Sequence, residues 1–111
     1  MTVRDIVKEL GLTVVSGKKG LDREVKNAYV SDLLSDVMGN ANEGDVWITL
    51  QTHKNVMAIA SLKEISCVIL VKGLEPESDA FDVSEEENIP ILSTDEKTFE
   101  LSGRLYQALH K

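Results

Sequence analysis

The run of residues 66–71, Ser-Cys-Val-Ile-Leu-Val, restricts the possible folds more than any other segment of the chain. A strand that is apolar on both faces is typical of a parallel sheet covered by helices on each side. From residue 46 onward the predicted order is strand, helix, strand, helix, strand, helix, which is typical of right-handed β-α-β units. The pattern therefore predicts an α/β fold: a small layered domain with a largely parallel sheet flanked by helices.

The expected elements follow from the spacing of apolar residues and from the residues that begin and end helices. Thr2 and Asp5 predict a capping box for the first helix, and Gly11 predicts its end. We expect strands at residues 12–16 and 21–30, joined as a hairpin by the turn at 17–20, and at 46–50, 66–71 and 89–92. We expect helices at residues 3–10, 33–38, 56–62, 78–87 and 95–111.

Helical spacing also predicts which side chains pack. One apolar face is expected to hold Val56, Ile59, Ala60 and Leu62, and the last helix is expected to pack through Phe99, Leu101, Leu105, Tyr106 and Leu109. Trp47 and Tyr106 fit either the core of the domain or the interface of a homodimer, because interfaces are enriched in aromatic side chains. Gly103 weakens the last helix unless a neighbour packs closely against it.

Length and charge limit the class of protein. The 111 residues predict a single domain, 1–111, and the net charge of −7 opposes binding to nucleic acid or to anionic lipid. Charged residues interrupt the first turns and no apolar run has the length of a membrane span, so we expect no signal peptide and a cytoplasmic protein. Cys67, the only cysteine, is expected to be a buried small hydrophobe rather than a reactive thiol.

The best candidate binding site is the polar corner after the strand at 46–50, formed by Thr49, Gln51, Thr52, His53 and Asn55. In open α/β sheets ligands bind at the carboxyl ends of strands, and helix N-termini offer free N–H groups to anions. A hydroxyl, an amide and an imidazole add directional hydrogen bonds to a phosphate, a carboxylate or a nucleotide. The alternative interpretation is local: Thr52 caps the following helix, while His53 and Asn55 are solvated.

A second corner, with Ser93, Thr94 and Thr98, follows the strand at 89–92, and it would share a cleft with the first if the two strands were neighbours. The alternative here is that Thr94 caps the last helix. Ser31 and Asp32 are likewise expected to be helix caps. The acidic run 85–87 is expected to be a solvated helix face, and no motif implies a metal or another cofactor.

Three segments carry a resemblance to a known family. Residues 29–38 (Tyr-Val-Ser-Asp-Leu-Leu-Ser-Asp-Val-Met), 44–55 (Gly-Asp-Val-Trp-Ile-Thr-Leu-Gln-Thr-His-Lys-Asn) and 88–100 resemble the DRTGG-domain family, and the order of elements extends the match over nearly the whole chain. Domains of this family are similar to the N-terminal domain of HPr kinase/phosphorylase, and they occur beside CBS domains in regulated pyrophosphatases. The resemblance implies a regulatory role without chemistry of its own, and frequent self-association. The motif Asp-Arg-Thr-Gly-Gly, from which the family takes its name, is absent from this chain: Asp22-Arg23 is followed by Glu24-Val25.

Three functions remain open from the sequence. The first is a non-catalytic regulatory or ligand-sensing module that binds a small anion or nucleotide at the corner of residues 51–55. The second is a homodimerisation or protein-interaction module without a small ligand, whose partner protein the sequence does not name. The third is a small enzyme that uses His53 as acid or base, which ranks last because no orienting partner for His53 is evident.

Overall fold

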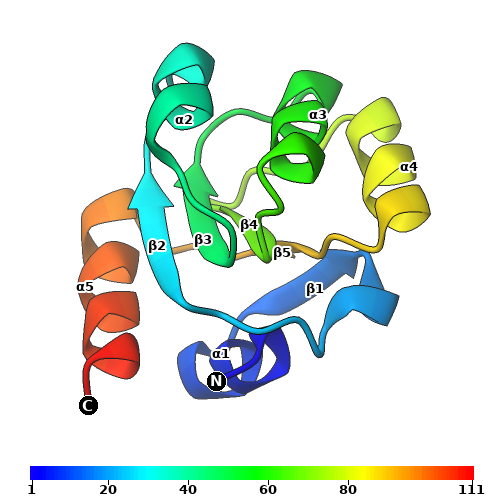
Figure 1. Cartoon of the computed structure of the whole chain (residues 1–111). Coiled ribbons are helices and arrows are strands. Elements are labelled where there is room, and N and C mark those ends of the chain that lie inside the picture. The colour runs from blue at the N-terminus through cyan, green and yellow to red at the C-terminus, as the bar shows by residue number, and fades with distance from the viewer.

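The computed structural model describes all residues, 1–111, and contains one five-stranded sheet in the order β1-β5-β4-β3-β2. The strands β2, β3, β4 and β5 are parallel, and β1 pairs antiparallel with β5 (Figure 1). The strands are β1 (Thr13–Ser16), β2 (Asn27–Val30), β3 (Asp45–Thr49), β4 (Cys67–Leu70) and β5 (Ile91–Ser93). The helices are α1 (Val3–Leu10), α2 (Leu34–Asn40), α3 (Lys54–Leu62), α4 (Ser78–Glu87) and α5 (Thr98–Leu109), with a short 3-10 helix at Lys18–Gly20.

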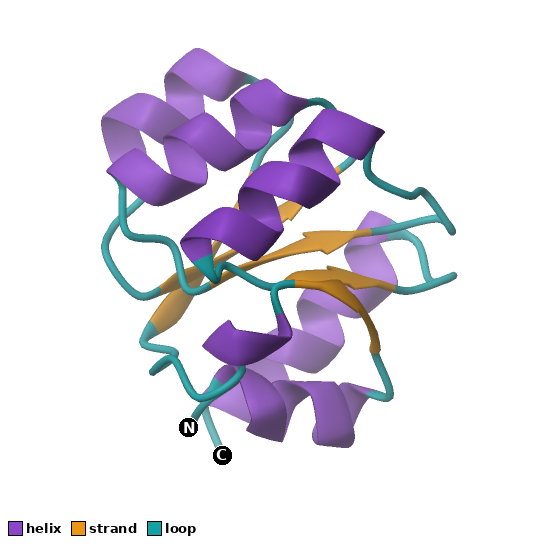
Figure 2. Cartoon of the chain, turned by 90° about the vertical axis from the view of Figure 1, so that its right-hand side faces the viewer, coloured by secondary structure: helices purple, strands orange, loops and turns teal.

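The sheet is the middle of three layers. Helices α2, α3 and α4 cover one face, and α1 and α5 cover the other (Figures 1 and 2). Each face has its own apolar cluster, because the side chains of β3 and β4 alternate between them: Trp47 and Val68 join the first, and Ile48 and Ile69 the second. The strands at the centre are buried on both sides, as the apolar run at 66–71 predicts. The α/β layered fold is therefore confirmed.

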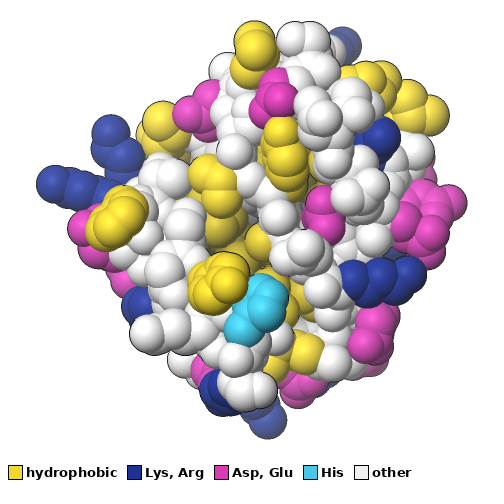
Figure 3. Space-filling view, turned by 60° about the vertical axis from the view of Figure 1, so that its left-hand side comes forward, with side chains coloured by type: hydrophobic (Ala, Val, Ile, Leu, Met, Phe, Trp, Pro, Cys, Tyr) yellow, Lys and Arg dark blue, Asp and Glu magenta, His cyan; other side chains and the backbone are white.

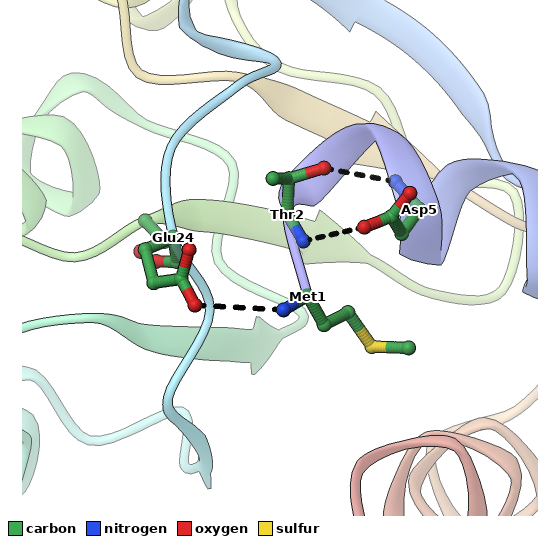
Figure 4. A network of polar contacts seen from close by, with 5 residues as sticks. Met1, Thr2, Asp5 and Glu24 are labelled. Atoms are coloured by element: carbon green, nitrogen blue, oxygen red, sulfur yellow. Dashed lines mark hydrogen bonds and ion pairs between the residues drawn. The ribbon is translucent and has the colours of Figure 1, made fainter.

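The N-terminal helix begins and ends where its sequence predicts. The Thr2 side chain accepts a hydrogen bond from the Asp5 N–H, and the Asp5 carboxylate accepts one from the Thr2 N–H at 2.8 Å (Figure 4). Two free N–H groups of the first turn are thereby satisfied, and the N-terminal ammonium lies 3.4 Å from a Glu24 carboxylate oxygen. Gly11 ends the helix in the left-handed conformation, with φ +66°. The capping box is thus confirmed.

The expected hairpin between residues 12–16 and 21–30 is wrong. Strand β1 lies at one edge of the sheet against β5, and β2 lies at the opposite edge against β3. The connection between them, residues 17–26, crosses the sheet at the amino ends of the parallel strands, where Lys26 donates its N–H to the Gly44 carbonyl at 2.9 Å. The β-branched residues of two successive segments indicate that both form strands, but they do not determine which strand pairs with which.

Several helical side chains also differ from expectation. Phe99 and Tyr106 on α5 are exposed, as is Leu62 at the end of α3, whereas Met57, which was not expected to pack, is fully buried. Helix α5 begins at Thr98, three residues later than expected, and Lys97, not Thr94, is its N-cap. Residues 94–97 instead bond to the chain that leaves β4, since Lys72 donates its N–H to the Glu96 carbonyl at 2.8 Å.

Candidate functional site

The predicted polar corner lies at the carboxyl ends of the parallel strands, between the end of β3 at Thr49 and the start of α3 at Lys54. Four hydrogen bonds shape it, and Asp32 accepts three of them. The buried Thr49 hydroxyl and the Leu50 N–H both donate to Asp32 Oδ1, at 2.9 and 2.6 Å. Gln51 donates its side-chain amide to the Asp32 carbonyl at 3.0 Å and its own N–H to Thr49 Oγ1 at 3.1 Å. The loop after β3 is therefore fastened to the loop after β2.

Asp32 is the residue of this site whose role the sequence did not reveal. It was expected to cap the short helix that follows, but α2 begins at Leu34 and has no side-chain cap. Ser31 also does not cap α2; its hydroxyl accepts a hydrogen bond from the Leu33 N–H at 3.2 Å, outside the helix. A local signal cannot distinguish a cap from a carboxylate that reaches a strand many residues later.

The second half of the corner faces the segment before α4. Thr52 donates its hydroxyl to Glu77 Oε2 at 3.4 Å, and Glu77 donates its N–H to the Thr52 carbonyl at 2.9 Å. The expectation that Thr52 caps α3 is wrong, because the N-cap is His53 and no side chain caps this helix. The His53 side chain is half-buried without a hydrogen bond to another residue of the chain, and Asn55 is exposed.

The space at this corner is small. Gln51, Thr52 and His53 line a slot of about 10 Å³, whose other walls are largely apolar and come from α3, β4, β5 and the start of α4. A volume of about 10–15 Å³ admits roughly one water molecule. With the Thr52–Glu77 contacts formed, the slot therefore has no room for a nucleotide.

The second corner does not share this slot. Strand β4 lies between β3 and β5, so the two strands are not neighbours, and the condition for a shared cleft is not met. Thr94 donates its N–H to the Leu70 carbonyl at 3.1 Å, and its hydroxyl accepts a hydrogen bond from the Glu96 N–H at 3.2 Å. Ser93 and Thr94 thus lie at the same carboxyl end of the parallel strands as the first corner, but two strands away from it.

A larger depression of about 440 Å³ opens at the opposite end of the parallel strands, beside their amino ends. Both cationic side chains of this depression already have partners within the chain. Arg23 donates to the carbonyls of Asn88 and Glu87 at 2.9 and 3.2 Å, and Lys26 lies 3.7 Å from a Glu43 carboxylate oxygen. Four glutamates outnumber these two cations, which opposes an anionic ligand. The lining residues are Arg23, Glu24, Lys26, Glu43, Gly44, Ser61, Glu64, Ser66, Glu87 and Ile89.

Other chemistry-bearing groups are few. Cys67 is the first residue of β4 and is buried in the apolar core, and burial raises the pKa of its thiol, as expected of a structural cysteine. Glu85, Glu86 and Glu87 are exposed on α4, which confirms the solvated acidic face. No group of three or more His, Cys, Asp or Glu side chains is arranged to hold a metal ion. No helix has both the length and the apolar character needed to cross a membrane.

Comparisons with known proteins identify the family. The model of the DRTGG domain matches residues 5–108. A similar solved structure contains the CBS and DRTGG domains of the regulatory region of Clostridium perfringens pyrophosphatase, in complex with the activator diadenosine tetraphosphate. The identity is 18%, the TM-score is 0.76, and the match covers 97% of this chain but 47% of that one. This chain therefore spans about half the length of that relative, with the same fold, and it belongs to the DRTGG-domain family.

Proposed function

We propose that this domain is a regulatory module that senses a small anionic ligand, first of all a nucleotide, and has no catalytic chemistry of its own. The observation that carries the proposal is that the chain belongs to the DRTGG-domain family. Another DRTGG domain lies in a pyrophosphatase regulatory region that was crystallised with a nucleotide activator. The proposed binding residues are Thr49, Gln51, Thr52, His53, Asn55, Ser93 and Thr94.

The position of the corner supports this assignment. It follows the carboxyl end of β3, the side on which open α/β sheets bind ligands. No side chain caps α3, so protein side chains leave the first N–H groups of this helix free for an anion. The half-buried imidazole of His53 and the exposed amide of Asn55 stand at this same helix end, without partners that a ligand would have to displace.

Ligand entry at this corner requires one local movement. Thr52 is already joined to Glu77 by two hydrogen bonds, so in this proposal an anionic group of the ligand takes the place of the Glu77 carboxylate beside Thr52. Glu77 is exposed and is the N-cap residue of α4, but its side chain makes no capping hydrogen bond, so moving this side chain costs the fold little. In this proposal the ligand replaces Glu77 as the partner of Thr52, and the start of α4 moves in response.

A thermal-shift titration tests the proposal. We expect diadenosine tetraphosphate, ATP, AMP or inorganic phosphate to raise the melting temperature of the wild type. The increase should be smaller in His53→Ala and larger in Glu77→Ala, where the competing carboxylate is gone. His110→Ala is the matched control, because it removes the chain's other histidine, at the far end of α5. If no compound at millimolar concentration shifts the wild type, or if the two histidine variants respond alike, the proposal is wrong.

A protein-interaction module without a small ligand is the second candidate. The observation that favours it is that Val30 of β2 and Tyr106 of α5 line one groove and are both exposed. A third candidate, an enzyme that uses His53, gains no support from the geometry, since no carboxylate or carbonyl hydrogen-bonds the imidazole to orient it.

A further inference from the structure

Residues 72–77, in the connection between β4 and α4, bridge the two candidate corners, and we call them the strap (Figure 1). At one end of the strap, Gly73 donates its N–H to the Thr94 carbonyl at 2.9 Å. At the other end, Glu77 donates its N–H to the Thr52 carbonyl at 2.9 Å and accepts the Thr52 hydroxyl at 3.4 Å. Because β4 lies between β3 and β5, the strap spans the distance from one corner to the other.

The first end of the strap is firmly held. Lys72 donates its N–H to the Glu96 carbonyl at 2.8 Å, in addition to the bond from Gly73. Both Lys72 and Gly73 have the left-handed conformation, with φ +61° and +71°, so the chain turns sharply as it leaves β4. Leu74 is half-buried and packs against the apolar cluster beneath α3 and α4. This end therefore stays with the sheet.

The second end is held less firmly. Its hydrogen bonds to the corner are the two between Glu77 and Thr52, and the Glu77 side chain does not cap α4. Between the two ends, the Glu75 N–H has no partner in the chain, and Pro76 has no N–H to donate. Segments with so few hydrogen bonds open locally while the rest of the fold stays intact.

We propose that the strap is a gate: the contacts between Glu77 and Thr52 break, the strap turns about Lys72 and Gly73, and the slot beneath it becomes a cleft that extends from Thr52 toward Thr94. The two contacts between Glu77 and Thr52 are the latch of this gate. The role of the gate in ligand entry rests on the function proposed above, whereas its opening does not.

The slot beneath the strap keeps the gate closed most of the time. Its walls include Pro76 of the strap, Ala80 in the first turn of α4, and Val56 and Met57 of α3. Opening exposes these apolar side chains to water, so the open form is a minor state. Figure 3 shows a different hollow among hydrophobic side chains, on the side of β2 and α5; β3 separates β4 from that side, so the gate opens independently of it.

Labelling of thiols by N-ethylmaleimide in the full chain, followed by mass spectrometry, tests the opening. Ala80 is 2% exposed and lines the slot, so the thiol of Ala80→Cys reacts when the strap opens. Ala60→Cys is the matched control, because Ala60 is 0% exposed in the same apolar cluster but does not line the slot. We expect Ala80→Cys to react at least about tenfold faster than Ala60→Cys and than the buried Cys67, which reports global unfolding.

Thr52→Val tests the latch. This change removes the hydroxyl that donates to Glu77 and keeps the shape of the side chain. The labelling rate of Ala80→Cys should rise roughly two- to tenfold, the factor that corresponds to one hydrogen bond, while that of Cys67 stays the same. Thr13→Val is the matched control, because Thr13 is exposed on β1 and its hydroxyl has no hydrogen bond within the chain.

Each result decides the proposal. Equal labelling rates of Ala80→Cys and Ala60→Cys overturn it, because the slot then opens only when the whole face unfolds, and so does a Thr52→Val variant without effect. If circular dichroism shows that a cysteine variant does not fold, hydrogen exchange of the unsubstituted chain decides instead. The Glu77 N–H should exchange faster than the Val68 N–H, which is bonded to Pro90 across the sheet, and equal exchange overturns the gate. Opening without stabilisation by any nucleotide would leave the gate in place and refute ligand sensing.

Discussion

Gly20 lies where the connection between β1 and β2 passes over the backbone that joins α4 to β5. A Cβ atom added at Gly20 would lie 1.9 Å from the Asn88 carbonyl oxygen and 2.9 Å from Pro90 Cδ. An ordinary carbon–oxygen contact is about 3.3 Å or longer, so the two segments would have to separate by more than 1 Å. The same carbonyl accepts the Arg23 guanidinium hydrogen bond at 2.9 Å, which this movement would also disturb.

We expect Gly20→Ala to destabilise the domain by about 3 kcal/mol, the upper part of the range for overpacked sites, because its obstacle is largely backbone that has no rotamer to change. For a domain of this size, 1 kcal/mol corresponds to roughly 4 °C in melting temperature, so the expected fall is about 12 °C. The φ angle of Gly20 is not positive, so the cost is steric rather than conformational.

Gly103→Ala is the matched control, with the opposite expected sign. Gly103 is exposed inside α5, and a Cβ there meets no atom within 4 Å. Alanine is favoured over glycine in a helix interior by about 1 kcal/mol, so the melting temperature should rise by roughly 4 °C. Thermal unfolding followed by far-UV circular dichroism, at one protein concentration, measures both variants. A melting temperature of Gly20→Ala equal to or above that of the wild type would refute the close approach of the two segments.

Three further outcomes follow from single side chains. Hydrogen bonds from Thr2 lower the pKa of Asp5 below its ordinary value near 3.8. The ionised carboxylate therefore stabilises the fold fully above pH 3.8, and this stabilisation is lost as the pH falls through the folded-state pKa. In urea unfolding, Asp5→Asn should be less stable than the wild type at pH 6 and equally stable in strong acid. Cys67 should react with a thiol reagent only after unfolding, because it is buried and its pKa is raised; fast labelling of the native protein would contradict this. Asp32→Ala should lower stability by about 1–2 kcal/mol in urea unfolding, because the buried Thr49 hydroxyl loses its acceptor, and Asp32→Asn, which keeps an acceptor oxygen, should lose less than half of that.

The elements that the sequence predicted well are those whose signals are local. The run at 66–71 identified β4 because a strand buried on both faces is apolar throughout. Helix α4 has the bounds that were expected, Ser78–Glu87, and Thr2 with Asp5 identified the start of α1. In each case the signal lies within the element that it identifies.

The failures all involve partners far away in the sequence. Thr94 resembles a helix cap, but its N–H bonds to the end of β4 and α5 begins later. Asp32 resembles a cap for α2, yet its carboxylate accepts hydrogen bonds from the end of β3. Tyr106 has the spacing of a packing residue but is exposed, since the buried face of α5 is set by where the helix meets the sheet. The residues of the candidate corner were identified because they are polar and follow a strand, whereas the contribution of Glu77 has no local signal.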